Sequence, residues 1–392
     1  MATDAAAAVS PGVSFTFRAA TRLLAGPGMI SKLGREVREL GGHRVLVVSD
    51  SGVIAAGHTE AGLSALAESG CETDVFSGFT ENPTTDQVEA GTAVARRFSP
   101  DLIVGLGGGS SMDCAKGINF LLCGGGRMEE YRGRGTTPLP LLPSIGCPTT
   151  AGTGSETQSF ALISRAETGE KLACGNPAAA FRVAILDPCL TLTQPARLTA
   201  LTGIDAISHA LESHVSTAAT PASRLFSREA WRLLAGHLPA VLGDGDNLAA
   251  RQAVQLGAAW AGLAIENAML GAAHALANPL TAIHGIAHGQ AVGLMLPHVI
   301  RFNAEVAGEH YAELARLAGL AGDSATELAA WLDNLVALAG LARSISQAVT
   351  SHLPPVEIDQ LAAEASRQWT GGFNPRPCTA ADFRCLYQQA VD

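Results

Sequence analysis

The chain has 392 residues, of which 47% are hydrophobic and 16% are charged, and its formal net charge is −10. A chain of this length usually needs more than one hydrophobic core, so two domains are expected in a compact soluble protein. The acidic balance argues against nucleic-acid binding, because no basic face is available to neutralise phosphates.

The ends, the cysteines and the hydropathy predict a cytoplasmic protein. Residues 1–12 lack the basic and apolar regions of a secretory signal, and we expect a disordered tail there. No uninterrupted apolar stretch reaches membrane-spanning length, so no membrane partner is expected. The eight cysteines are scattered without a C-x-x-C pair, which is typical of unpaired thiols in a reducing compartment.

The first half alternates β-branched runs with helical patterns, which predicts a parallel sheet with crossover helices. The predicted strands cover residues 44–49, 73–77 and 102–106. The predicted helices cover residues 58–69, 85–97 and 111–121, the second one capped by Thr84 or Thr85.

From about Gln194 the strand patterns stop, and Ala/Leu-rich helical stretches follow, for example over 222–238 and 248–265. We therefore predict an α/β nucleotide-type domain over 13–193 and an all-helical domain over 194–392, which the resemblance given below makes the dinucleotide-binding and the metal-binding catalytic domain.

Two features of the first half are typical of a nucleotide site. Gly107-Gly108-Gly109-Ser110 directly follows a predicted strand, and glycine there lets the backbone and a helix N-terminus approach a pyrophosphate. The spacing is not G-x-G-x-x-G, so a tight turn is the alternative. Asp50 ends the first strand and is suited either to bind an adenosine ribose or to form a turn before Ser51-Gly52.

A group of metal-ligand residues lies in the helical half. Asp205 and His209 are four residues apart and would share one face of a helix. His274 lies on a second Ala-rich segment, and His288 begins a glycine-flanked loop or helix. Three imidazoles and a carboxylate suit a divalent metal such as iron or zinc. Each histidine alone is also compatible with ordinary core packing, and His284 and His298 are further histidines nearby.

With these motifs together, the chain resembles the iron-containing (group III) alcohol dehydrogenase family. The matching residues run in order through almost the whole chain: Gly107 to Ser110 with Asp113 and Lys116, the segment 148–156, Asp187-Pro188, Thr202-Gly203-x-Asp205-x-x-x-His209-Ala210-x-Glu212, His274, His288-Gly289, Leu296-Pro297-His298 and Asn374-Pro375-Arg376.

The resemblance implies an active site in the cleft between a dinucleotide domain and a helical domain. It assigns Asp205, His209, His274 and His288 to the metal, with Fe(II) as the first choice and Zn(II) as the alternative. It assigns cofactor binding to Asp50, Gly107, Gly108, Gly109, Ser110, Asp113, Thr149, Thr150, Thr153 and Lys171. Asp50 favours NAD(H) over NADP(H), and the family habit is a homodimer.

The chain departs from the family where many members carry a second histidine, four residues after the third ligand. This sequence has Asn278 there, and an amide cannot act as a general base near neutral pH. The proton path must then use water, a ribose hydroxyl or another histidine, of which His284 is the nearest in sequence.

The implied reaction is hydride transfer between the nicotinamide C4 and a small alcohol or aldehyde bound to the metal. An anionic aldehyde such as phosphonoacetaldehyde or a semialdehyde is an alternative substrate, for which Arg134 or Arg376 could line the cleft. Rival functions are an NAD- and metal-dependent carbon–oxygen lyase of the dehydroquinate-synthase type and maleylacetate reductase. A further rival is a non-catalytic binding protein with the same fold.

Overall fold

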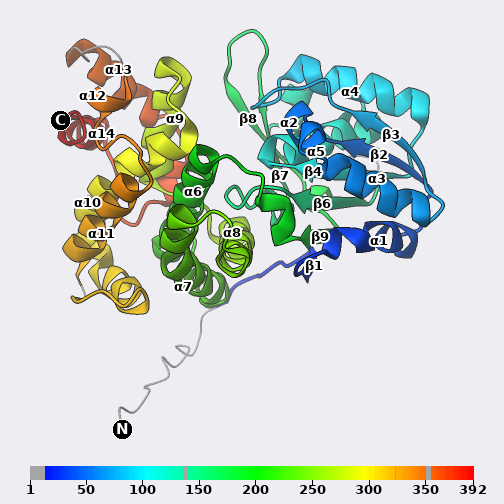
Figure 1. The fold of residues 1–392 in the computed structure, drawn as a ribbon. Coiled ribbons are helices and arrows are strands. Elements are labelled where there is room, and N and C mark those ends of the chain that lie inside the picture. Colours follow the sequence, from blue (N-terminus) through cyan, green and yellow to red (C-terminus); the bar gives the residue numbers. More distant parts are fainter. Residues whose placement is uncertain (1–13, 136–139, 323, 350–354) are drawn as a thin grey trace.

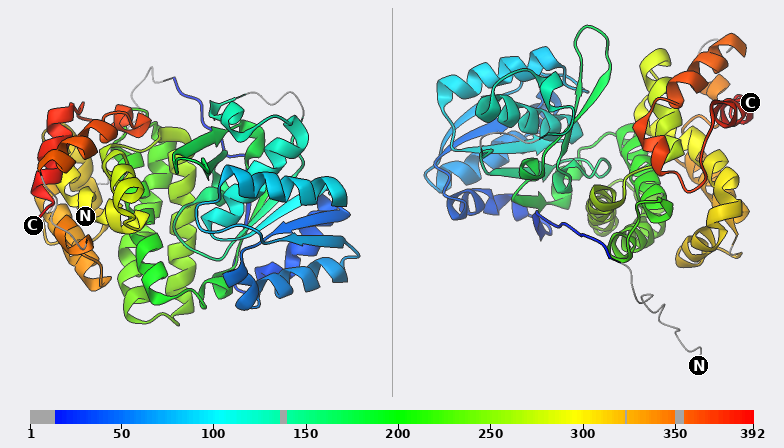
Figure 2. Two further views of the ribbon diagram at one scale, coloured as in Figure 1. Left: turned by 90° about the horizontal axis from the view of Figure 1, so that it is seen from above. Right: turned by 180° about the vertical axis from the view of Figure 1, so that it is seen from behind.

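The computed structural model describes residues 14–135, 140–322, 324–349 and 355–392, so the predicted tail over 1–12 lies outside the described residues. An α/β part and a helical part lie side by side, as Figure 1 and both views of Figure 2 show. The order of the two parts along the chain follows the predicted one. No helix in the described residues is both long and apolar enough to cross a bilayer.

The α/β part is built on a six-stranded parallel sheet in the order β1-β9-β6-β4-β2-β3. Its strands are β1 (Arg22–Ala25), β2 (Arg44–Val48), β3 (Glu72–Phe76), β4 (Leu102–Gly107), β6 (Ser144–Pro148) and β9 (Val183–Leu186). The three predicted strands are β2, β3 and β4, each shifted by no more than one residue at either end. The prediction of a parallel sheet is confirmed.

Helices cover both faces of this sheet, which explains the continuous apolar runs of its central strands. Val45 and Val47 of β2 pack with α1 (Leu33–Glu39) and α3 (His58–Glu68). The alternate residues Leu46 and Val48 pack with α4 (Thr85–Phe98) and α5 (Gly109–Gly124). Thr84 caps α4 and forms a capping box with Gln87. Thr84 is one of the two capping residues that the sequence predicts. The short α2 (Ser51–Ala55) follows β2.

A second, three-stranded sheet was not predicted. It consists of β5 (Gly133–Arg134), β8 (Lys171–Gly175) and β7 (Phe160–Ser164), with β7 and β8 antiparallel. Ile163 and Leu172 of this sheet join Ile118 of α5 in one buried cluster. The second sheet therefore covers α5, the helix that begins at the glycine loop.

The helical part contains no strand among its described residues, as the sequence predicts. Its helices are α6 (Ala196–Val215), α7 (Pro221–Gly243), α8 (Leu248–Ala268), α9 (Ala272–His284), α10 (His288–Leu317), α11 (Ala325–Leu338), α12 (Ile345–Ala348), α13 (Pro355–Ala365) and α14 (Ala380–Gln389). Short 3-10 helices occur in both parts: η1 (Met29–Lys32), η2 (Met128–Tyr131), η3 (Ser155–Thr157), η4 (Pro177–Ala179), η5 (Pro188–Thr191) and η6 (Trp369–Phe373).

The two parts meet closely where α8 packs on the loop around η3. A Cβ on Gly262 of α8 would clash with Thr157 Oγ1 and lie 2.5 Å from the carbonyl oxygen of Gly154. Close by, Thr157 Oγ1 donates to the Ala259 carbonyl at 3.0 Å, and Ser159 Oγ donates to Glu266 Oε1 at 2.6 Å. The helical part thus holds the segment that follows β6 in place.

The Gly262 contact can be tested by Gly262→Ala. We expect a loss of about 1–3 kcal/mol in the free energy of unfolding, because the added methyl has no space. The matched control is Gly236→Ala in α7, where a Cβ meets nothing within 4 Å and alanine is the better helix former. Urea unfolding of the two variants measures the difference, and equal stabilities would contradict the close packing described.

Candidate metal centre and cofactor loop

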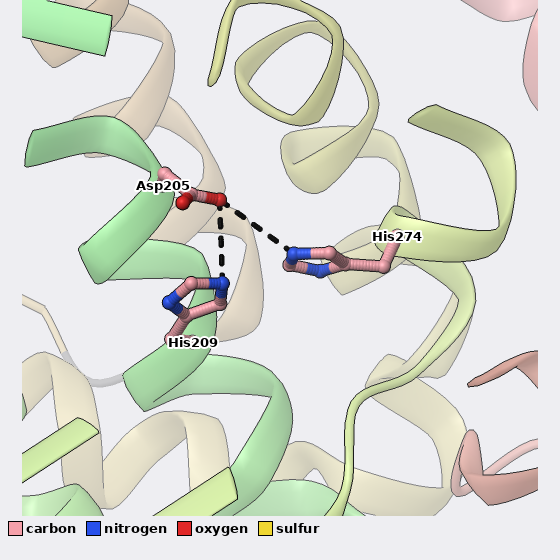
Figure 3. A group of neighbouring side chains, drawn as sticks. All are labelled: Asp205, His209 and His274. Carbon is pink, nitrogen blue, oxygen red and sulfur yellow. Dashed lines mark ion pairs between the residues drawn. The ribbon is translucent and has the colours of Figure 1, made fainter. Parts of the chain in front are cut away.

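Three helices bring the four predicted metal ligands together. Asp205 and His209 lie one turn apart on α6, His274 is the third residue of α9, and His288 is the first residue of α10. Figure 3 shows Asp205 between His209 and His274. Gly289 makes the approach of α10 possible, because a Cβ there would overlap the carbonyl oxygen of Leu201 on α6. The packing of α10 on α6 therefore requires the glycine that follows His288 in the sequence.

Asp205 Oδ1 is the common point of the cluster. It lies 3.3 Å from His209 Nε2, 3.6 Å from His274 Nε2 and 3.7 Å from His288 Nε2. Candidate ligand atoms of Asp205, His209 and His274 all lie within 4.8 Å of one another, a group that does not include His288. The His288 side chain is also the most exposed of the four, at 28%. His288 therefore forms the open rim of the cluster.

The buried polar atoms of this cluster fit a cation. Asp205 Oδ1 and His274 Nε2 are buried and make no hydrogen bond to any described residue. A buried polar atom without a partner is costly, and a divalent cation between the carboxylate and the imidazoles would remove that cost. Three imidazole nitrogens and one carboxylate oxygen are donors that iron(II) and zinc(II) both accept.

The protonation states also suit metal binding. Burial by itself would raise the pKa of Asp205, but the neighbouring His209, His274 and His288 lower it below its ordinary value. Burial lowers the pKa of His209 and lowers that of His288 to about 3. At neutral pH this gives a charged Asp205 carboxylate beside neutral His209 and His288 imidazoles, the forms that bind a metal ion.

Glu212 orients one of the imidazoles, a role that the sequence analysis did not assign. Glu212 Oε2 accepts a hydrogen bond from His274 Nδ1, while Oε1 accepts the backbone N–H of Ala273 at 2.7 Å. Burial opposes a charge on His274, but Glu212 and Asp205 raise its pKa to about 9. With Nδ1 bound to Glu212, Nε2 faces Asp205. The position of Glu212, three residues after His209 on α6, could have indicated this role.

The predicted cofactor loop joins β4 to α5. Gly107 has φ +151° and a Cβ there would clash with Ser111 Oγ, so the turn requires glycine. The helix begins at Gly109, two residues earlier than predicted, which exposes the free backbone N–H groups of its first turn directly after the strand.

The predicted threonines pack against this loop. Thr149 donates its backbone N–H to the Gly107 carbonyl at 2.9 Å. A Cβ on Gly108 would lie 3.3 Å from Thr150 Cγ2, and one on Gly109 would lie 2.8 Å from Thr153 Cγ2. The structure thus brings these two predicted segments together.

Asp50 forms the turn before α2 and lies beside the glycine loop. Its Oδ1 caps α2 by accepting the backbone N–H groups of Gly52 and Val53, at 2.9 and 3.1 Å. Its Oδ2 accepts the Ser111 hydroxyl at 3.1 Å, which holds the carboxylate beside the glycine loop. The neighbouring Ser110 Oγ accepts the backbone N–H of Asn82 at 3.2 Å.

Asp113 lies inside the α/β part. It accepts a hydrogen bond from Ser155 Oγ at 2.7 Å. The buried Lys116 donates to the Ser155 and Gln158 carbonyls, at 2.7 and 2.9 Å. These contacts hold the segment after β6 against α5. Burial lowers the pKa of Lys171, and Asp205 and Asp113 both oppose this, so Lys171 lies within electrostatic range of these two carboxylates.

The residues considered for a proton path have other partners. Asn278 Nδ2 donates to Gln368 Oε1 at 3.0 Å. His284 Nε2 lies 3.4 Å from Glu357 Oε1, and the residue is the last one of α9. Ten residues of helix separate His284 from His274, about 15 Å along the axis.

The described structure gives little support to an anionic substrate bound by the two arginines that the sequence analysis considered. Arg376 Nη1 donates to the Phe302 carbonyl at 2.9 Å, and its guanidinium stacks on the Phe302 ring at 4.1 Å. The side chain of Arg134 lies outside the described residues.

Comparison with known families agrees with this geometry. Residues 20–188 match the iron-containing alcohol dehydrogenase family, and residues 199–391 match the C-terminal domain of the Fe-containing alcohol dehydrogenase family. The chain belongs to the iron-containing alcohol dehydrogenase family. It is an enzyme, a metal-dependent oxidoreductase of alcohols or aldehydes.

Similar members of the iron-containing alcohol dehydrogenase family match over nearly their whole length. 1,3-Propanediol dehydrogenase of Klebsiella pneumoniae is 34% identical over 93% of this chain and 96% of that protein. The crystal structure of a 1,3-propanediol oxidoreductase superposes with a TM-score of 0.92 at 32% identity, covering 97% of this chain and 100% of that one. Sulfoacetaldehyde reductase of Bifidobacterium kashiwanohense, in complex with NAD+, has a TM-score of 0.89 at 27% identity, over 97% and 100%.

Glu212→Gln tests the orienting carboxylate of this family member. An amide leaves His274 Nδ1 with a weaker acceptor, so we expect the affinity for Fe(II) or Zn(II) to fall about 10–100-fold. Competition with a chelator measures the affinity. Glu68→Gln, at the exposed end of α3, is the control and should bind metal as the wild type does. An unchanged affinity in Glu212→Gln would show that Glu212 does not orient the ligand.

Proposed function

We propose that the chain is an NAD(H)-linked alcohol dehydrogenase and aldehyde reductase that binds one divalent metal, Fe(II) or Zn(II), through Asp205, His209, His274 and His288. The observation that carries the proposal is the convergence of three imidazoles on Asp205 Oδ1, at 3.3 to 3.7 Å. Asp205 Oδ1 and His274 Nε2 are buried, and no described residue forms a hydrogen bond with either atom.

The proposed division of work follows from the positions of these residues. When bound, the metal supplies Lewis acidity toward the substrate oxygen, and the nicotinamide accepts or delivers a hydride. Asp205, His209 and His274 are buried and hold the inner side of the site, whereas His288 lies at the open rim where a substrate would enter. Glu212 fixes the His274 ring. A proton would reach the site through water or a ribose hydroxyl, because Asn278 cannot accept one and His284 pairs with Glu357.

The proposed cofactor site is the loop between β4 and α5. The N–H groups at the start of α5 would bind the pyrophosphate, with Gly107, Gly108, Gly109 and Ser110 allowing a close approach. Thr149, Thr150 and Thr153 would line the adenine and ribose side, and Lys171 would reach a ribose. Asp50 beside the loop supports NAD(H), because its carboxylate would repel a 2′-phosphate.

A neutral aldehyde or alcohol is the first choice of substrate, since Arg376 is already engaged with Phe302. Reduction of an anionic aldehyde is the second candidate, because one structural relative is a sulfoacetaldehyde reductase. Lys171, within electrostatic range of Asp205, is a cation that could face such a substrate.

His274→Ala tests the metal assignment. We expect loss of bound metal and a fall in aldehyde-dependent NADH oxidation by on the order of 100-fold or more, because the innermost imidazole is removed. The control is His237→Ala in α7. His237 is half-buried, and among the described residues its side chain forms a hydrogen bond only with the Leu233 carbonyl of the same helix. Metal content and NADH absorbance are measured on Fe(II)- and Zn(II)-loaded protein.

Full activity and metal content in His274→Ala would refute the ligand set. If the wild type consumes no NADH on a panel of neutral and anionic aldehydes, the dehydrogenase itself is refuted. A lyase that regenerates its cofactor would give that second result.

Asp50→Asn tests the cofactor preference without removing the α2 cap, because asparagine caps helices as well as aspartate does. Loss of the charge should raise the ratio of kcat/KM for NADPH to that for NADH, roughly tenfold, which corresponds to about 1.4 kcal/mol. The exposed Asp86→Asn in α4 controls for net charge and should leave the ratio unchanged. An unchanged ratio in Asp50→Asn would assign the preference to other residues.

A further inference from the structure

A second cluster of metal-ligand side chains lies in the helical part, outside the proposed active site. His214 is close to the C-terminal end of α6, and His310 and Glu313 lie one turn apart on α10. Candidate ligand atoms of the three residues all lie within 4.8 Å of one another. His214 lies five residues beyond His209, so their side chains point about 140° apart around α6 and cannot share one ion.

The hydrogen bonds around His214 leave a lone pair directed toward a carboxylate. Ser227 Oγ donates to the Arg224 carbonyl at 3.1 Å, so its oxygen accepts from His214 Nδ1 at 3.0 Å. A neutral ring with its proton on Nδ1 has a lone pair on Nε2. That nitrogen lies 3.4 Å from Glu313 Oε2, is fully buried, and makes no hydrogen bond to any described residue.

The lone pair of His214 Nε2 and the carboxylate oxygen Oε2 of Glu313 repel each other at this distance unless a proton or a metal ion lies between them. A proton on Nε2 is one solution. In a neutral ring it would require the Ser227 hydroxyl, which donates to the Arg224 carbonyl, to turn toward Nδ1. In a charged ring it is opposed by burial, Arg224 and Arg228, which lower the pKa of His214 although Glu313 raises it. A metal ion is the other solution, and the His310 ring provides a further ligand. The His214 and His310 rings are edge to face, with centroids 5.3 Å apart.

The charges around the cluster leave room for a cation. Arg228 Nε is bound to Glu313 Oε1 at 2.7 Å, so it occupies the oxygen that does not face His214. Arg224 donates its Nε to the His214 carbonyl at 3.1 Å and is thereby directed to the backbone. The carboxylate of Glu309, within electrostatic range of His310, offsets part of this positive charge.

We propose that His214, His310 and Glu313 form a second, non-catalytic site for a divalent transition metal of the Zn(II) type, completed by water. Two imidazoles and one carboxylate oxygen are an established ligand set for zinc. The ion would connect the end of α6 to α10, the two helices that carry Asp205, His209 and His288. It would therefore stabilise the packing of the helices that hold the active-site cluster. The proposal does not depend on the proposed function.

The experiment is a count of metal ions per chain. Wild-type protein, His310→Gln and His237→Gln are loaded with Zn(II), dialysed and analysed by mass spectrometry for zinc and by amino-acid analysis for protein. We expect two ions per chain in the wild type and in the His237→Gln control, and one in His310→Gln. Excess Zn(II) should also raise the Tm of His310→Gln less than that of the other two proteins, because a ligand stabilises the fold that binds it.

His310→Gln should retain aldehyde-dependent NADH oxidation, because His310 lies outside the proposed active site, and this separates the present proposal from the proposed function. If His310→Gln does not fold, as judged by circular dichroism, Glu313→Gln replaces it with the same expectation. The same number of ions per chain in the wild type and in His310→Gln would overturn the proposal, whatever the occupancy of the active-site cluster. Two ions in the folded variant would also overturn it.

Discussion

The arrangement of the helical part depends on one buried carboxylate. Asp205 Oδ1 lies within 3.7 Å of three imidazole nitrogens that come from three helices, and such a group is stable only if a cation or protons balance it. Two further contacts serve the same arrangement, namely the close approach of Gly289 to Leu201 and the hydrogen bonds of Glu212 to α9. They bring α6, α9 and α10 close enough for their side chains to share one ion.

The α/β part is joined to the helical part that carries this cluster through the loop around η3. Lys116 and Asp113 hold Ser155 from one side, and α8 holds Thr157 and Ser159 from the other. The threonines of the same loop pack against Gly108 and Gly109. The position of the proposed pyrophosphate site is therefore fixed relative to the helical part. Such a fixed relation is what hydride transfer between a bound nicotinamide and a substrate at the metal requires.

The sequence predicted the features that depend on local pattern. The buried strands β2, β3 and β4, the cap of α4 and the change to helices after β9 follow from apolar runs, a capping threonine and periodicity. The ligand set came from residue types at helical spacing together with the family resemblance. The β5-β8-β7 sheet was missed because β8 has the sequence KLACG, with no β-branched or aromatic residue, and β5 has only two residues. His214 and Glu313 were missed because they are distant in sequence, so only the packing of α6 against α10 reveals their contact. Glu212 was missed although its position three residues after His209 could have indicated its role.

The most direct test of the central claim is a crystal structure of the metal-loaded protein with anomalous diffraction at the iron or zinc edge. The account predicts a strong peak at bonding distance, about 2.0–2.2 Å, from Asp205 and from the imidazole nitrogens of His209, His274 and His288. A peak at a position that leaves Asp205 uncoordinated, with no peak between these four residues, would contradict the account.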